Sequence, residues 1–123
     1  MAKVLVVDDD TDVRDSLGEW LMREHEVRRA ASVPEAMDAI AAEEPDAIIT
    51  DFELPPYRGD DFLALVAERH PRCGRFMLTG SPGKALGFAY SIAHRVLKKG
   101  CDPRDLSTAI RTFLATREVN TAS

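Results

Sequence analysis

The chain lacks the features that would indicate a membrane protein or a secreted, disulfide-bonded one. It has two cysteines, Cys73 and Cys101, spaced neither as a zinc knuckle nor as a disulfide framework, so we expect two reduced thiols. No apolar run approaches the roughly 20 residues that span a bilayer. The opening Met1-Ala2-Lys3 meets 3 acids by Asp10, which is unlike a signal peptide. We therefore expect a cytoplasmic protein without membrane insertion.

Positive charge is also in short supply. The 16 Lys and Arg residues stand against 21 Asp and Glu residues, which gives a formal net charge of −5. Because nucleic-acid phosphates are bound by clustered Lys and Arg in excess, direct nucleic-acid binding is not expected. A chain of 123 residues can form one domain with a core but is too short for two. We place the domain at residues 1–118 and a short C-terminal tail at 119–123.

Short apolar runs alternate with helical patterns along the chain. Five runs predict strands, at 3–7, 26–30, 47–50, 76–78 and 96–97. Apolar residues at helical spacing follow each run, and Ser32 with Glu35 forms a capping box that starts the second helix. Pro103 is a preset first residue for the last helix. The fourth helix has the weakest signal, because Gly83 and Gly87 lower its helix propensity.

This alternation predicts an α/β fold with one parallel sheet and helices on both faces. No linker or low-complexity segment separates the five strand–helix units, so they are expected to share one core. Right-handed crossovers bring the C-terminal end of every strand to the same edge of the sheet. Ligands of open parallel sheets bind at that edge, beside the point where the strand order reverses. Functional residues are therefore expected where the strands end.

The residues that follow the predicted strands include carboxylates, a hydroxyl and ammonium groups. In chain order they are Asp8, Asp9, Asp51, Thr79, Lys98 and Lys99. Three neighbouring carboxylates repel one another and raise each other's pKa unless they share a cation. All-oxygen ligation by few protein groups suits Mg²⁺, while lysine and threonine supply a positive charge and a hydrogen-bond donor for phosphoryl oxygens. A carboxylate nucleophile beside Mg²⁺ is a phosphoryl acceptor.

Other polar residues near these positions have simpler interpretations. Adjacent strand residues face opposite ways, so only one of Lys98 and Lys99 can point into the site. Asp10 is interpreted as a helix cap or a solvated neighbour. Taken alone, Asp8 and Asp9 could be an acidic cluster favoured at a helix N-terminus. The three histidines stand at element ends among polar residues and are expected to be solvated and not to bind metal: His25, His70 and His94.

Four motifs, in this order, resemble the receiver domain of two-component response regulators. They are VLVVDDD at 4–10, IITDFELP at 48–55, MLTG at 77–80 and LKK at 97–99. The resemblance runs from Lys3 to about Leu114. It implies a flavodoxin-like strand order of 2-1-3-4-5 and Mg²⁺-dependent transfer of a phosphoryl group from a sensor histidine kinase or a histidine phosphotransfer protein. It also implies signalling to a downstream protein that the sequence does not identify, and no enzymatic turnover of outside substrates.

The same resemblance assigns roles to individual residues. Asp51 would be the phosphoryl acceptor and would give one oxygen to Mg²⁺. Asp9 would bind the ion directly, Asp8 mainly through a water molecule, and Glu53 through its backbone carbonyl. Two further side chains would contact the phosphoryl group, Thr79 and Lys99. The output surface would be formed by the last helix and the fourth helix.

Two positions depart from the family pattern. The family lysine usually precedes a proline in a cis peptide, and an aromatic residue usually lies three positions before it; Gly100 and Val96 occupy these places. Reorientation of an aromatic ring at residue 96 therefore cannot report phosphorylation. Gly59, by contrast, matches a loop glycine of the family. The chemistry of phosphorylation is expected to be intact, whereas its usual readout is not.

Two alternative functions are compatible with part of this pattern. A phosphate sink or pseudo-receiver would switch weakly, and a pseudo-receiver would not need the complete set of site residues. A small Mg²⁺-dependent phosphatase with an aspartate nucleophile would need a second acid and a cap over its site, for which the length leaves no room. Turnover of a generic phosphomonoester distinguishes this enzyme from a receiver. The sequence leaves open whether the chain acts alone or belongs to a longer regulator or hybrid kinase.

Overall fold

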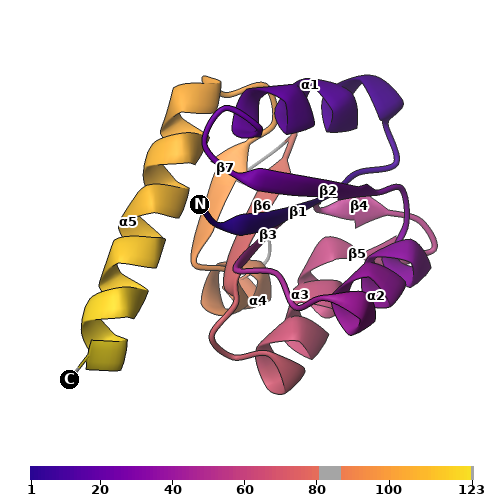
Figure 1. Cartoon of the computed structure of the whole chain (residues 1–123). Helices are drawn as coiled ribbons and strands as arrows, with labels where there is room; N and C mark the ends of the chain where they lie inside the picture. The colour runs from indigo at the N-terminus through magenta and orange to yellow at the C-terminus, as the bar shows by residue number, and fades with distance from the viewer. Residues whose placement is uncertain (81–86, 123) are drawn as a thin grey trace.

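A parallel sheet of five strands forms the centre of the molecule, in the order β2-β1-β3-β6-β7 (Figure 1). The computed structural model describes residues 1–80 and 87–122, with side chains described through residue 117. The strands of this sheet are β1 (Lys3–Val7), β2 (Glu26–Ala30), β3 (Ala47–Asp51), β6 (Gly74–Thr79) and β7 (Arg95–Lys98). Counted within this sheet alone, the order is 2-1-3-4-5, which confirms the flavodoxin-like prediction.

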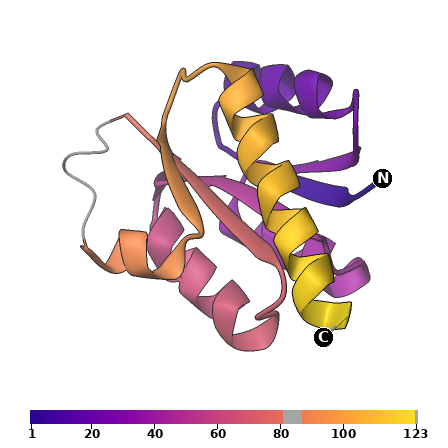
Figure 2. The ribbon, with the colours of Figure 1, turned by 90° about the vertical axis from the view of Figure 1, so that its left-hand side faces the viewer.

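Helices cover both faces of the sheet. One face carries α1 (Thr11–Leu21) and α5 (Pro103–Ala122), and Figure 2 views the molecule with α5 in front of the sheet. The other face carries α2 (Val33–Ala42), α3 (Gly59–Arg69) and α4 (Gly87–Ile92). Successive strand residues alternate between the two cores, as strand geometry requires: Val4 lies in the first core and Leu5 in the second.

The starts of α1 and α2 follow from their caps. Ser32 Oγ accepts a hydrogen bond from the Glu35 amide at 3.3 Å, which is one of the two bonds of the predicted capping box. The Glu35 carboxylate accepts from the Ser32 hydroxyl at 3.3 Å, whereas the capping box pairs it with the Ser32 backbone amide. Asp10 Oδ1 accepts from the amides of Asp12 at 2.9 Å and Val13 at 3.2 Å. Asp10 is therefore the cap of α1, as one interpretation of the sequence held.

Two features differ from the sequence predictions. A hairpin of β4 (Glu53–Leu54) and β5 (Tyr57–Arg58) precedes α3, where no strand is predicted, because strands of 2 residues leave no hydropathy period. The prediction that His25 is solvated is wrong, since this residue is only 9% exposed. The His25 amide donates to the Leu21 carbonyl at 3.0 Å, and this tight turn after α1 folds the ring inward.

Several further expectations can be compared with the structure. Both cysteines are free thiols, as predicted. Among the described helices, none is long and apolar enough to cross a membrane. Gly83 lies outside the described residues, and α4 is described from Gly87 onward. The helix α5 continues past residue 118, so the expected domain end falls within this helix and stays a prediction.

Candidate functional site

The carboxyl ends of β1 and β3 bring three aspartates together. The two strands are paired in parallel, with Val7 opposite Thr50, so the residues that follow lie at the same edge. One carboxylate oxygen from each of three side chains lies within 4.8 Å of the others, and the side chains are Asp8, Asp9 and Asp51. Asp8 and Asp51 are buried, whereas Asp9 is exposed. The carboxylates expected from the strand ends therefore form one cluster.

Lys99 places an ammonium group in this cluster. Its Nζ donates to Asp51 Oδ2 at 2.8 Å and lies 3.6 Å from Asp8 Oδ2. Burial opposes the charged form of Lys99, but the hydrogen bond to Asp51 and the negative charges of Asp51 and Asp8 raise its pKa above the usual value. Lys98 is exposed and pairs with Thr79 in the strand register. Lys99, not Lys98, therefore reaches the aspartates, and its contact with a phosphoryl group stays a prediction.

The Asp8 carboxylate is buried without full hydrogen bonding. Its Oδ1 accepts from the Asp10 amide at 2.9 Å, whereas its Oδ2 accepts no hydrogen bond from any described residue. Burial raises the pKa of Asp8 above its ordinary value, the Asp10 amide opposes this rise, and the charge of Asp51 adds to it. A buried carboxylate oxygen that accepts no hydrogen bond is costly, and a second cation beside it, in addition to the Lys99 ammonium at 3.6 Å, would reduce that cost. The donor set of three carboxylates therefore fits a hard divalent cation.

The backbone around Asp51 is held by the segment that leads into α3. The Glu53 amide donates to Asp51 Oδ1 at 3.2 Å, and the Gly59 amide donates to the Phe52 carbonyl at 2.7 Å. A Cβ on Gly59 would collide with the carbonyl oxygen of Asp51. Glycine is thus required where the first residue of α3 approaches the backbone of Asp51. The metal-binding role of the Glu53 carbonyl stays a prediction.

Thr79 lies at the same edge, at the end of β6. Its side chain is buried, and β6 pairs directly with β3 through Leu78 opposite Asp51. A Cβ built on the next residue, Gly80, meets no atom of the described residues within 4 Å. A buried carboxylate, an ammonium and a hydroxyl thus lie at the same edge of the sheet. This arrangement can hold a cation and an anionic phosphoryl group side by side.

Sequence reasoning missed one cationic neighbour of the cluster. Arg14, one turn into α1, donates from Nη1 to the Asp8 backbone carbonyl at 2.9 Å. Its spacing from Asp8 could have indicated this contact, because the first turn of a helix that follows a parallel strand faces the end of that strand. Arg14 brings positive charge close to the aspartates and ties α1 to the end of β1.

Comparisons with known proteins agree with this geometry. A family model described as "Response regulator receiver domain" matches residues 4–111. The response regulator protein PilR of Pseudomonas aeruginosa is 34% identical over 118 residues, which cover 94% of this chain and 26% of PilR. The chain thus spans far less than two thirds of that relative.

Two solved structures are similar over nearly their whole length. A response regulator receiver domain protein from Clostridium thermocellum has a TM-score of 0.87 and 27% identity, with 97% of this chain and 98% of that chain covered. A CheY-like response regulator receiver domain protein from Methanospirillum hungatei has a TM-score of 0.88 and 28% identity, with 98% of each chain covered. The likeness thus extends over the whole described fold.

Proposed function

This chain belongs to the response regulator receiver domain family of two-component systems, and from that premise we propose that Asp51 accepts a phosphoryl group. The donor would be a sensor histidine kinase or a histidine phosphotransfer protein. The observation that carries the proposal is the buried Asp51 carboxylate, which Lys99 Nζ contacts at 2.8 Å beside two further aspartates. The output would be contact with a downstream protein, without direct nucleic-acid binding.

In the proposed reaction a carboxylate oxygen of Asp51 attacks the phosphorus of a phosphohistidine. The P–N bond breaks as the new P–O bond forms, and the leaving imidazole nitrogen takes up a proton. Because Lys99 already contacts Asp51, its charge is preorganised for the phosphoryl oxygens. The Thr79 hydroxyl, at the end of the neighbouring strand, can donate a hydrogen bond to the same group.

Mg²⁺ is the cofactor that we propose for this site. Asp8, Asp9, Asp51 and the Glu53 carbonyl would hold it, and the buried Asp8 Oδ2, which accepts no hydrogen bond from the described residues, supports a cation at this place. When bound, Mg²⁺ would neutralise charge on the phosphoryl oxygens. The chain's own residues keep the acceptor buried and orient it through the Glu53 amide.

Phosphorylation would act as a switch by adding roughly one to two negative charges beside Thr79 and Lys99. That charge would shift an existing equilibrium between inactive and active conformations. Exposed Phe88 and Tyr90 on α4 support the assignment of α4 and α5 to the output surface. Val96, in place of an aromatic residue, favours a phosphate sink with weak switching as the second candidate function.

Two further parts of the proposal concern enzyme class and location. We propose no turnover of outside substrates, only assistance to the protein's own phosphorylation and dephosphorylation. A generic phosphomonoester such as p-nitrophenyl phosphate should therefore not be hydrolysed catalytically.

We also place the protein in the cytoplasm, and its two free cysteines support a reducing compartment.

The test is labelling with acetyl phosphate, followed by mass mapping of the modified residue. We expect one added phosphoryl group on Asp51 in the presence of Mg²⁺, and none in Asp51→Asn or in excess chelator. Asp9→Ala should raise the Mg²⁺ requirement more than Asp10→Ala, because the Asp10 side chain caps α1. Full labelling of Asp51→Asn would reject the proposal.

A further inference from the structure

An ion pair between a half-exposed arginine and a buried aspartate lies in the segment that holds the backbone of Asp51. Asp60, the second residue of α3, is 0% exposed. Two nitrogens of Arg58 donate hydrogen bonds to the Asp60 carboxylate, Nε to Oδ1 at 3.1 Å and Nη2 to Oδ2 at 2.6 Å. Such a two-point guanidinium–carboxylate contact fixes the mutual orientation of both side chains. Arg58 is therefore held in place although 47% of its side chain is exposed.

Arg58 also contacts the two residues that follow Asp51. In the β4–β5 hairpin it stands opposite Glu53, whose amide donates to Asp51 Oδ1 at 3.2 Å. Its guanidinium carbon lies 5.3 Å from the centre of the Phe52 ring, within the range of a cation–π contact. One arginine thus connects both neighbours of Asp51 to α3.

Asp60 anchors the other end of this connection in the first turn of α3. Its Oδ1 accepts a hydrogen bond from the Asp61 amide at 2.9 Å as well as from Arg58. Between the two partners lies Gly59, which approaches the Asp51 backbone too closely to carry a Cβ. A shift of the hairpin relative to α3 would therefore be transmitted to the backbone of Asp51.

We propose that Arg58 and Asp60 position the phosphoacceptor site by locking the β4–β5 hairpin onto α3. Both are positioning residues, since they act on Asp51 through Glu53, Phe52 and Gly59. An ion pair with one exposed partner contributes little net stability, because the Coulomb attraction is screened on the exposed side and the buried carboxylate is desolvated. What this pair supplies is orientation. The inference rests on the proposed function of Asp51 and names residues that set its metal requirement.

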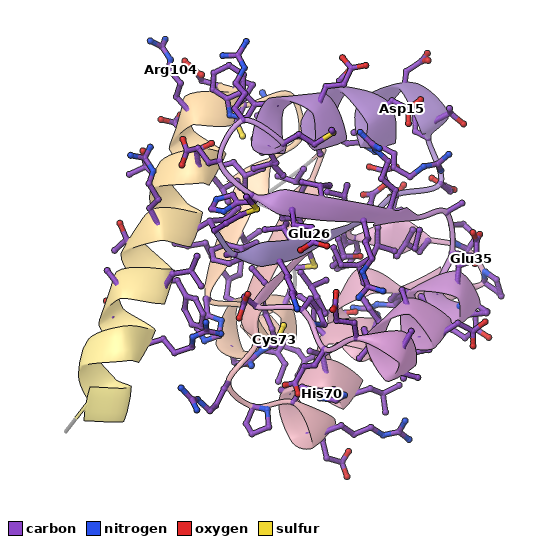
Figure 3. All side chains as sticks on the ribbon, in the orientation of Figure 1. Asp15, Glu26, Glu35, His70, Cys73 and Arg104 are labelled. Carbon is purple, nitrogen blue, oxygen red and sulfur yellow. The ribbon has the colours of Figure 1, made fainter. Side chains whose placement is uncertain are left out.

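The test compares Arg58→Met with a matched control, Arg104→Met. Arg104 Nη2 lies 2.7 Å from Oδ2 of Asp102, which is also two residues away but precedes the arginine. Both side chains of this control pair are exposed, and Arg104 lies on the outer surface at the start of α5 (Figure 3). For each variant we measure the half-saturating Mg²⁺ concentration for labelling by acetyl phosphate, together with urea unfolding. We expect an increase of about tenfold or more for Arg58→Met, as for residues that orient metal ligands, and no change for Arg104→Met.

A second variant separates positioning from stability. Arg58→Met leaves Asp60 buried without its cation, so the double variant Arg58→Met/Asp60→Leu removes both charges. A folded double variant that still needs about tenfold more Mg²⁺ supports the proposal. An intermediate Mg²⁺ requirement in Arg58→Lys also supports it, because lysine keeps the positive charge but cannot make the two-point contact. A folded double variant with the unsubstituted protein's Mg²⁺ requirement overturns it.

The outcome for the unsubstituted protein separates this inference from the proposed function. If Asp51 is not labelled in Mg²⁺, the proposed function fails and this inference fails with it. If Asp51 is labelled normally and the Arg58 variants show an unchanged Mg²⁺ requirement, the inference alone is overturned.

Discussion

The two edges of the central sheet hold aspartates in opposite electrostatic states. At the carboxyl edge, burial raises the pKa of Asp8 above its ordinary value. At the amino edge, burial alone would raise the pKa of Asp46, yet the pKa is lowered because two donors stabilise the carboxylate. The Lys3 amide donates to it at 2.8 Å and the Arg117 guanidinium at 3.0 Å. The charged form of aspartate is thus stabilised at the amino edge, by Asp46's two donors, and disfavoured at the carboxyl edge, where Asp8 is buried.

This difference shows which edge is built for function. At the amino edge Glu43 also has its own cation, Lys3, at 2.9 Å. At the carboxyl edge Lys99 pairs with two of the three clustered aspartates, Asp51 at 2.8 Å and Asp8 at 3.6 Å, and no described residue donates a hydrogen bond to Asp8 Oδ2. Two buried aspartates thus share one ammonium here, whereas each carboxylate at the amino edge has its own donor. The proposed Mg²⁺ would compensate for the excess negative charge at the carboxyl edge.

The largest expected effect follows from removing the cation of the carboxyl edge. Lys99→Ala deletes the ammonium that contacts Asp51 at 2.8 Å and should abolish the conformational change that phosphorylation induces. The change is measured by NMR chemical shifts with and without beryllium fluoride and Mg²⁺. Lys98→Ala, on the exposed side of the strand, and Arg117→Ala, at the amino edge, should both retain it. Loss of switching in Lys98→Ala with switching intact in Lys99→Ala would contradict the assignment.

The carboxyl edge could be predicted because its determinants are local. Asp8 and Asp51 follow apolar runs, parallel strands end at one edge, and strand alternation allows only one of two adjacent lysines to face the site. The amino edge could not be predicted in this way. Arg117 and Asp46 are separated by 71 residues and meet only after α5 packs on the sheet.

The ion pair of Arg58 and Asp60 was also not predicted from the sequence. An arginine two residues from an aspartate is a common surface pattern, and the exposed pair of Arg104 and Asp102 has this spacing in the reverse order. What separates them is the burial of Asp60 at 0% exposure, which depends on how α3 docks beside β3. The roles of Thr79 and of the Glu53 carbonyl stay predictions for the corresponding reason, since they depend on a bound ligand.

A smaller effect should appear in the stability of the metal-free protein, with opposite signs at the two edges. Asp8→Asn removes a buried charge beside other carboxylates and should raise the free energy of unfolding by about 1 kcal/mol. Asp46→Asn weakens the hydrogen bonds from Lys3 and Arg117 and should lower it by about 1 kcal/mol. Urea unfolding in chelator measures both values. Equal signs for the two variants would contradict the contrast between the edges.

The pH dependence of these variants sharpens the same contrast. Because the pKa of Asp46 is lowered in the folded protein, its stabilisation of the fold is complete above the unfolded pKa of about 3.9. This stabilisation is lost as the pH falls through the folded pKa. The folded pKa of Asp8 is raised, so its contribution is most favourable below about 3.9 and is lost as the pH rises through the folded value. The loss of unfolding free energy in Asp46→Asn should therefore become smaller toward acid pH. The gain of unfolding free energy in Asp8→Asn should become larger toward neutral pH.

The smallest expected effect concerns how far phosphorylation is felt from the carboxyl edge. Added charge beside Thr79 and Lys99 should change amide exchange on the order of a few-fold between these residues, including α4, whose Gly87 lowers helix propensity. Val96 offers no aromatic ring to carry the signal, so coupling either goes through rearrangement of the loop and α4 or is weak. Exchange in α1, in α2 and at Asp46 should change little, as measured by mass spectrometry with a phosphoryl mimic and Mg²⁺. If exchange from Thr79 to Lys99 is identical with and without the mimic while binding at Asp51 is verified, the domain accepts phosphate without switching by this route, and a phosphate sink becomes the better account.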